Sequence, residues 1–267
     1  MSYWREKTAS VTGGSSGLGL VLAGAFARAG ANVVLAARDP AKLEAARKSL
    51  PPERVLAMPA DVTDPTQLRW LVEKTRDQLG RLDPFFPCAG ISDRGGALQT
   101  PPERYRELWE LNFLSAVHVA QATAESLIES QGHLGFIGSL ASKTASRYLG
   151  AYPASKFPLA ALAQQLRLEL GPQGVHVLLA CPGPIARQDS GSRYDSLAAD
   201  LPPEARRPGG GVKLKGISPE KLAQQILNAC RRRTPELVVP GRARLLFALQ
   251  QLWPSLGDWI LRRSSSG

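Results

Sequence analysis

The segment KTASVTGGSSGLGLVLAGAFARAG, residues 7–30, decides the fold class. Lys7–Val11 is short and apolar and predicts a strand, and Leu18–Ala29 predicts a helix. The turn between them consists of Thr12, Gly13, Gly14, Ser15, Ser16, Gly17, Leu18 and Gly19. Gly13 allows a tight turn, while Gly17 and Gly19 let the backbone approach a pyrophosphate and let the helix pack closely on the sheet. Because the helix N-terminus offers unpaired N–H groups and a positive dipole, we favour a dinucleotide site over an ordinary turn.

Outward from this segment, strand-like and helix-like patterns alternate along the chain. Further strands are predicted at Asn32–Ala37, Arg54–Ala60, Asp83–Pro87, His133–Ser139, Val175–Ala180 and Glu236–Val239. Helices are predicted at Pro40–Leu50, Pro65–Leu79, Pro102–Ser130 and Tyr152–Gly171. Strands separated by helices indicate an α/β fold with a parallel sheet that is covered on both faces. The polar stretch 188–216 is expected to be a long loop, with the role of a substrate lid.

Composition limits the classes of partner and site. The chain has 267 residues, enough for one large α/β domain, and a formal net charge of +10. That charge suits a phosphorylated cofactor, an anionic membrane or nucleic acid, but the basic residues lack the interleaved aromatics of a nucleic-acid module. The three cysteines and three histidines are far apart, so we expect neither disulfides nor a metal site. No leader and no membrane-spanning stretch is recognised, which favours a cytoplasmic protein.

The end of the second strand bears on the choice of nucleotide. An acidic residue that binds the ribose 2′-hydroxyl is expected about 20 residues after the turn. The strand ends instead with Ala36, Ala37 and Arg38, which can accept a 2′-phosphate and favours NADP(H) over NAD(H). The alternative is that Arg38 pairs with the adjacent Asp39.

The end of the third strand leaves two roles open for Asp61 and Val62. These residues bind the adenine, or Asp61, Thr63 or Asp64 caps the helix that begins at Pro65.

A tyrosine and a lysine four residues apart, Tyr152 and Lys156, share one face at the start of a helix. A tyrosine hydroxyl has a pKa near 10, and a nearby ammonium group lowers it. The pair can then exchange a proton with a carbonyl or alcohol oxygen while a nicotinamide carries hydride. Ser139 lies thirteen residues earlier at the end of a strand, where ligands bind in doubly wound sheets.

With these motifs in order, the chain resembles the short-chain dehydrogenase/reductase family, in the branch of about 250 residues with a Tyr-x-x-x-Lys centre. The resemblance extends from Lys7 to Val239 and rests on the glycine turn together with Asp61, Ala89, Gly90, Asn112, Ser139, Tyr152, Lys156, Pro182 and Gly183. It implies a seven-stranded doubly wound Rossmann sheet, a single catalytic domain over residues 1–240, and a homodimer or homotetramer packed through the two long helices.

The resemblance also implies the roles of single residues. Tyr152 exchanges the proton and Lys156 also binds the nicotinamide ribose. Ser139 orients the substrate carbonyl, and Asn112 holds a water in a proton relay. The cofactor is expected to contact Gly13, Ser15, Ser16, Gly17, Leu18, Gly19, Arg38, Asp61, Val62, Ala89, Gly90, Tyr152, Lys156, Pro182, Gly183 and Ile185.

The sequence departs from the family pattern at several positions. The turn after the fourth strand has Cys88 where the family has asparagine, and Pro84 and Pro87 predict that this strand is short or distorted. Pro158 is expected to kink the helix that begins at Tyr152. Arg187 stands where the family often has a threonine that meets the nicotinamide amide.

The C-terminal tail, residues 241–267, is amphipathic, aromatic and bracketed by arginines. It is expected to pack on a partner subunit, to cap the substrate pocket or to contact a membrane surface. The function predicted from the whole sequence is NADP(H)-dependent reduction of a carbonyl, or oxidation of a secondary alcohol, on an apolar small molecule. The rival hypothesis, motivated by the departures above, is a nucleotide-binding sensor or scaffold without turnover.

Overall fold

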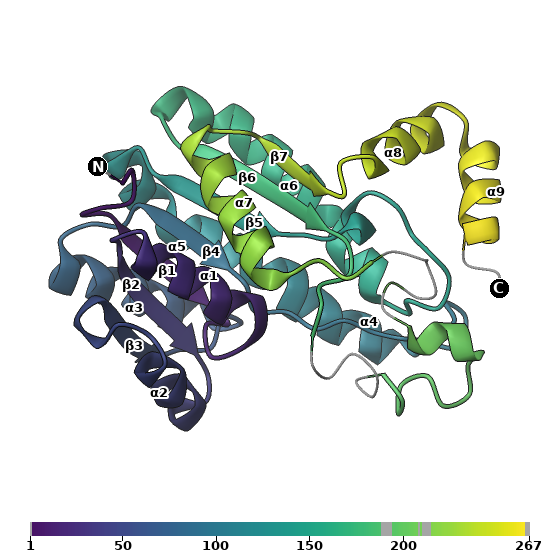
Figure 1. The fold of residues 1–267 in the computed structure, drawn as a ribbon, viewed down its shortest axis with the longest axis horizontal. Helices are drawn as coiled ribbons and strands as arrows, with labels where there is room; N and C mark the ends of the chain where they lie inside the picture. The colour runs from purple at the N-terminus through teal and green to yellow at the C-terminus, as the bar shows by residue number, and fades with distance from the viewer. Residues whose placement is uncertain (1, 188–193, 208, 210–214, 265–267) are drawn as a thin grey trace.

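Seven parallel strands form one sheet with the order β3-β2-β1-β4-β5-β6-β7 (Figure 1). The computed structural model describes residues 2–187, 194–207, 209 and 215–264. The strands are β1 Thr8–Thr12, β2 Asn32–Ala37, β3 Val55–Pro59, β4 Pro84–Pro87, β5 His133–Ile137, β6 His176–Pro182 and β7 Glu236–Val239. Every pairing between neighbours is parallel, so the doubly wound fold expected from the sequence is confirmed.

Helices cover both faces of the sheet. They are α1 Gly17–Arg28, α2 Pro40–Lys48, α3 Pro65–Leu79, α4 Pro102–Trp109, α5 Ser115–Ser130, α6 Tyr152–Leu170, α7 Pro219–Arg231, α8 Ala243–Leu252 and α9 Pro254–Ser264. Buried side chains of α1, α2 and α7 form a core on one face, and those of α3, α5 and α6 form a core on the other (Figure 1). Burial on both faces explains why the strands are nearly continuous apolar runs.

The fourth strand is short, as its prolines predict. β4 has four residues, and Pro84 and Pro87 stand at its two ends. Phe85 and Phe86 between them are fully buried on opposite faces of the sheet. The N–H of Cys88 donates to the carbonyl of Thr12 (3.1 Å), so the pairing with β1 resumes directly after the second proline. The strand therefore tolerates two residues without N–H donors because they lie at its ends.

A proline lies inside one of the two long helices, and a π-helical turn interrupts the other. Pro158 lies inside α6, and the helix continues to Leu170. The predicted helix 102–130 is divided into α4 and α5 by a π-helical turn, Glu110–Leu114. Such wide turns are frequent at functional sites, and this one contains the buried Asn112.

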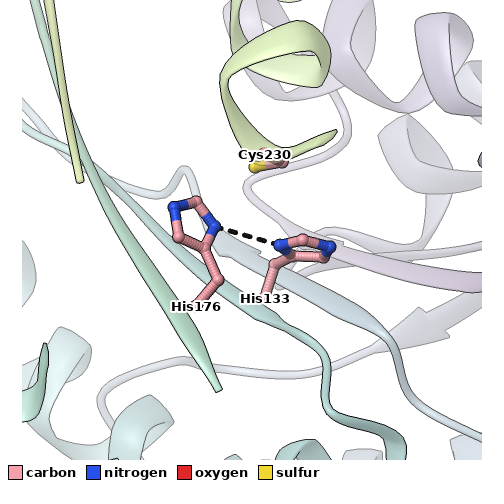
Figure 2. A group of neighbouring side chains, drawn as sticks. All are labelled: His133, His176 and Cys230. Atoms are coloured by element: carbon pink, nitrogen blue, oxygen red, sulfur yellow. Dashed lines mark hydrogen bonds between the residues drawn. The ribbon is translucent and has the colours of Figure 1, made fainter. Parts of the chain in front are cut away.

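A group of side chains at the N-terminal ends of β5 and β6 shows that one prediction was wrong. We expected no histidine near a cysteine, but ligand-type atoms of His133, His176 and Cys230 lie within 4.8 Å of one another (Figure 2). The two Nδ1 atoms are 3.0 Å apart, the Nε2 of His176 is 2.8 Å from the carbonyl oxygen of Thr234, and the Nε2 of His133 is 2.8 Å from the hydroxyl of Tyr3. The correction follows from topology, because β5 and β6 are neighbours and begin at the same edge.

Proton positions in this group follow from its fixed end. A carbonyl oxygen only accepts, so Nε2 of His176 carries the proton, its Nδ1 accepts from His133, and His133 accepts from the hydroxyl of Tyr3. Burial lowers the pKa of His133 to about 3 and that of His176 to about 4, and positive charge on Arg233 acts in the same direction. All four ring nitrogens are used, so we interpret the group as a neutral hydrogen-bond chain.

Candidate active site

A cavity of about 770 Å³ lies at the carboxyl ends of the strands. The residues directly after each of the seven strands line it: Gly13, Arg38, Ala60, Cys88, Gly138, Gly183 and Pro240. This is the edge at which doubly wound sheets bind ligands. The cavity also reaches the predicted residues Ser15, Ser16, Gly17, Leu18, Gly19, Val62, Ala89, Gly90, Ser139, Tyr152, Lys156, Pro182 and Ile185.

The glycine turn forms a cradle that side chains would fill. A Cβ on Gly13 would lie 2.6 Å from the backbone nitrogen of Ala89, and one on Gly19 would lie 2.4 Å from the carbonyl oxygen of Gly13. Gly13 and Gly17 have φ values of 64° and 56°, which glycine adopts most easily. The N-cap Ser16 makes no side-chain bond to the described part of α1, so the first N–H groups of the helix point at the cavity without a protein cap.

Basic side chains surround the part of the cavity beyond this turn. Arg38 and Lys42 both line it and are largely exposed. The ion pair of Arg38 is with Asp61 at 3.9 Å, whereas the adjacent Asp39 caps α2 by accepting from the N–H groups of Ala41 and Lys42. A long, exposed ion pair contributes little, so the guanidinium of Arg38 remains available to an anion.

The segment after β3 was predicted either to bind the adenine or to cap the next helix, and its hydrogen bonds show which residue is the cap. Asp64 caps α3 by accepting from the N–H of Thr66 at 2.8 Å. The carboxylate of Asp61 accepts from the N–H and hydroxyl of Thr63 and thereby braces the turn. Of the two predicted adenine contacts, Val62 is among the described residues that line the cavity and Asp61 is not.

Tyr152 and Ser139 meet in the cavity. Tyr152 is the first residue of α6, Ser139 follows β5, and both side chains line the cavity. Burial raises the pKa of Tyr152, and the hydrogen bond to Ser139 and the positive charges of Arg94 and Arg187 oppose that rise. Two residues thirteen positions apart thus present two hydroxyl groups at one point of the cavity.

Lys156 lies one turn after Tyr152 and lines the same cavity. Its Nζ donates to the carbonyl oxygen of Ile137 at 3.0 Å. Burial lowers the pKa of Lys156 to about 8. We expected Lys156 to lower the pKa of Tyr152, but in this structure the opposing charges belong to the two arginines named above.

Asn112 lies behind the cavity rather than in its wall. Its amide nitrogen donates to the carbonyl of Ile91 and to the hydroxyl of Ser155, and its amide oxygen accepts from the N–H of Ile91. The buried amide is therefore satisfied, which removes the energetic objection to placing it in a helix. A pocket of about 10 Å³, lined by Asn112 and Lys156, lies between them and is close to the smallest volume that holds one water.

Arg94 is a site residue that the sequence analysis missed. Arg94 is 5% exposed and lines the cavity, and its guanidinium donates to the carbonyl oxygens of Asp93, Ala205 and Arg207. It also lies 3.5 Å from the ring centroid of Tyr194. Burial lowers the pKa of Arg94. The one signal in the sequence was the position of this arginine, a few residues after the fourth strand. Arginines in such loops are too common for that position to be diagnostic.

The neighbouring Asp93 was also missed. Its carboxylate is buried, accepts from the N–H of Ala151 at 3.1 Å and pairs with Arg104 at 3.1 Å. Asp93 therefore fixes the residue directly before Tyr152. Parts of the lid predicted at 188–216, namely 188–193, 208 and 210–214, lie outside the described residues.

The C-terminal helices close one side of the cavity. Leu246 and Phe247 of α8 and Ile260 and Leu261 of α9 line it. Of the three alternatives for the tail, this geometry agrees with a cap on the pocket. Within the described part of the chain, no helix is long and apolar enough to cross a membrane.

Comparison with known sequences agrees with this geometry. Residues 7–195 match the model of the short chain dehydrogenase family. A dehydrogenase/reductase SDR family protein 7-like of Drosophila melanogaster is 30% identical over 96% of this chain and 80% of its own length. The 1-deoxy-11-beta-hydroxypentalenate dehydrogenase of Streptomyces exfoliatus is 37% identical over 68% of each chain. The 3-dehydrosphinganine reductase of Danio rerio is 32% identical over 64% of this chain and 54% of its own.

Solved structures resemble most of the chain. A short-chain dehydrogenase from Streptomyces avermitilis superposes with a TM-score of 0.79 at 24% identity, over 98% of this chain and 99% of the other. A short-chain type dehydrogenase/reductase from Mycobacterium ulcerans gives a TM-score of 0.75 at 26% identity, over 88% of each chain. The C-terminal helices are thus included in the first of these superpositions.

Proposed function

The chain belongs to the short-chain dehydrogenase/reductase family, and from this premise we propose that it is an NADP(H)-dependent oxidoreductase that reduces a carbonyl or oxidises a secondary alcohol on an apolar small molecule. The observation that carries the proposal is a convergence. Tyr152 and Ser139 line one cavity of about 770 Å³ together with residues 13 and 15–19 of the glycine turn. A cavity of that size is within the range of sites for cofactors and small ligands.

The residues that would hold the nucleotide satisfy a steric test. Any side chain at Gly13 or Gly19 would collide with neighbouring backbone, so the turn keeps an open cradle before the N-terminus of α1. A Cβ on Gly17 would lie 3.5 Å from Nη2 of Arg187, which adds positive charge beside a bound pyrophosphate. Arg38 and Lys42 support a preference for the 2′-phosphate of NADP(H) over the bare ribose of NAD(H).

In the proposed reaction the bound nicotinamide supplies or accepts hydride. Tyr152 gives its hydroxyl proton to the carbonyl oxygen during reduction and takes it back during oxidation. Ser139 donates to the same oxygen and holds it beside Tyr152. Lys156 would hold the ribose hydroxyls of the nicotinamide, and a water held between Asn112 and Lys156 would return a proton to Tyr152 after the reduction.

Apolar lining supports the substrate class. The lining of the cavity includes the apolar side chains of Leu140, Leu149, Leu246, Phe247, Ile260 and Leu261. Burying an apolar substrate against such a wall is favourable at about 25 cal/mol per Å². The similar proteins named above include both a dehydrogenase and a reductase, so the assay covers reduction of the carbonyl and oxidation of the alcohol.

The test combines nucleotide binding with turnover. The purified protein is titrated with NADPH and with NADH by fluorescence and then assayed on a panel of apolar ketones and secondary alcohols. We expect tighter binding of NADPH, turnover in wild type, and binding without turnover in Tyr152→Phe. Full activity in that variant would refute the mechanism, and tighter binding of NADH would refute the role of Arg38. Tight nucleotide binding by the wild type with no turnover on the panel would favour the sensor hypothesis.

A further inference from the structure

The C-terminal hairpin, defined as α8, α9 and the connection between them, has an unusual outer surface. It extends away from the sheet at one end of the molecule (Figure 1). Leu245 is 77% exposed and Leu252 is 86% exposed, and their spacing of seven residues places them on one face of α8. Trp253, in the connection, is 63% exposed, and Trp259 on α9 is 47% exposed. Side chains of this size are costly to leave in water.

Arginines accompany these apolar side chains. Residues 241–264 contain four arginines and one aspartate, a formal net charge of +3. Arg242 and Arg244 stand at the start of α8, and Arg262 and Arg263 stand at the end of α9. The guanidinium of Arg263 lies 4.7 Å from the ring centroid of Trp259. Exposed tryptophan, leucine and arginine side chains on the same pair of helices have the chemistry of the boundary between lipid headgroups and acyl chains.

We propose that the outer face of the C-terminal hairpin docks on an anionic lipid surface. Leu245, Leu252 and Trp253 enter the acyl boundary, and the flanking arginines contact anionic headgroups. Each arginine close to such a surface strengthens binding about fivefold at low salt. The apolar side chains add a contribution that salt does not screen, so binding has both an electrostatic and a hydrophobic part.

The opposite face of the same hairpin lines the cavity. On α8, Leu246 and Phe247 face the cavity while Leu245 and Leu252 face outward. On α9, Ile260 and Leu261 face the cavity. A docked hairpin therefore lies between the cavity and the lipid surface, with one apolar face turned to each. Docking itself is independent of the proposed function, because it concerns the outer face alone.

A second copy of the chain is a weaker occupant for this face. Two-fold pairing brings the same patch of each copy together. That pairing would oppose two hairpins of formal charge +3, and like charges facing each other are unfavourable. An anionic lipid surface complements the same charge. Complementarity is thus the observation that selects lipid over self-association.

The experiment is flotation of the full chain with lipid vesicles. One set of vesicles is phosphatidylcholine alone, and the other contains about one third phosphatidylserine. The double variant Leu245→Gln/Leu252→Gln removes the outer apolar stripe and keeps helix-forming residues. The matched control is Leu98→Gln, because Leu98 is 94% exposed and lies outside the hairpin. NADPH titration and thermal unfolding show whether each variant keeps its fold.

We expect wild type and Leu98→Gln to float with the anionic vesicles, and about 0.5 M salt to weaken that binding. The double variant should bind the anionic vesicles at least roughly tenfold more weakly than wild type, with its NADPH affinity and midpoint of unfolding unchanged. Failure of wild type to bind anionic vesicles, or equal binding by the double variant, would overturn the proposal. Sedimentation velocity measures the oligomer in parallel, and dissociation of the double variant without vesicle binding by wild type would assign the face to a second copy. If wild type binds the anionic vesicles but shows no turnover, that result counts against the proposed function and leaves the docking proposal standing.

Discussion

The buried histidine pair should make the fold sensitive to mild acid. His133 and His176 are held neutral in a chain of hydrogen bonds, and their pKa values in the folded state are about 3 and 4 (Figure 2). In the unfolded chain a histidine has a pKa of about 6.5. The folded pKa is therefore the lower of the two, so the unfolded state takes up protons first as the pH falls. Stability present above about pH 6.5 is lost progressively down to about pH 4 for His176 and about pH 3 for His133.

The magnitude follows from the unfolded pKa once the folded values lie well below the test pH. At pH 5 each unfolded histidine gains RT ln(1 + 10^1.5), which is about 2 kcal/mol. Two histidines give a loss of about 4 kcal/mol between pH 7.5 and pH 5, a large fraction of the usual stability of a domain. Charges around the pair act in the same direction, because Lys7 and Arg233 face His133, and Arg167 and Arg233 face His176.

Urea unfolding at the two pH values, followed by circular dichroism, measures this loss. The variant His176→Gln cannot be protonated in this range, so its loss should fall to about 2 kcal/mol even though it is less stable at pH 7.5. His118→Gln, which lies outside the pair, is the matched control and should keep the full loss. A wild-type loss below about 1 kcal/mol, or the same loss in His176→Gln as in wild type, would refute the reasoning.

Three substitutions test other parts of the structure. Gly13→Ala should abolish NADPH binding and destabilise the fold by several kcal/mol, because the new Cβ would lie 2.6 Å from the nitrogen of Ala89 at a φ of 64°; fluorescence titration and thermal unfolding measure both effects. Asp83→Ala should reduce the free energy of unfolding by about 2 kcal/mol in urea, because it leaves the buried N–H of Thr8 without its acceptor and removes the buried carboxylate that pairs with the half-exposed Arg81. Arg94→Met should raise KM more than tenfold, because Arg94 lines the cavity, and should increase amide exchange in residues 194–207, because the carbonyl oxygens of Ala205 and Arg207 each lose a charged donor worth about 1.5 kcal/mol or more.

Each of these has a result that would contradict it. NADPH affinity within twofold of wild type in Gly13→Ala would mean that the turn is not the phosphate cradle. An Asp83→Asn variant as unstable as Asp83→Ala would show that the ion pair matters more than the hydrogen bond. Unchanged exchange in Arg94→Met would mean that other contacts hold the segment, with Arg94→Lys as the control that keeps the charge and loses the planar fork.

The sequence predicted features whose information is local. Gly13, Gly17 and Gly19 are required by the backbone geometry of a single turn, and Tyr152 and Lys156 share a face because they are four residues apart on one helix. Most strand and helix positions followed from the same short-range periodicity, but α7 Pro219–Arg231 was not predicted, and residues 102–130 were predicted as one helix. The end residues of β4 were predicted to limit its length, since proline acts on its own residue and its immediate neighbours.

Features that depend on which loops and strands meet were decided by tertiary structure alone. The pairing of β5 with β6 brings His133 to His176, and the folding of residues 194–207 over the cavity surrounds Arg94 with carbonyl oxygens. The C-terminal helices return to the cavity and present Leu246 to it and Leu245 to the outside. In each case the partners are separated by tens of residues, so the energy of the contact comes from packing between distant segments. Local sequence pattern specifies the face of a helix that is apolar, but the surface that the face covers is set only when the whole sheet has assembled.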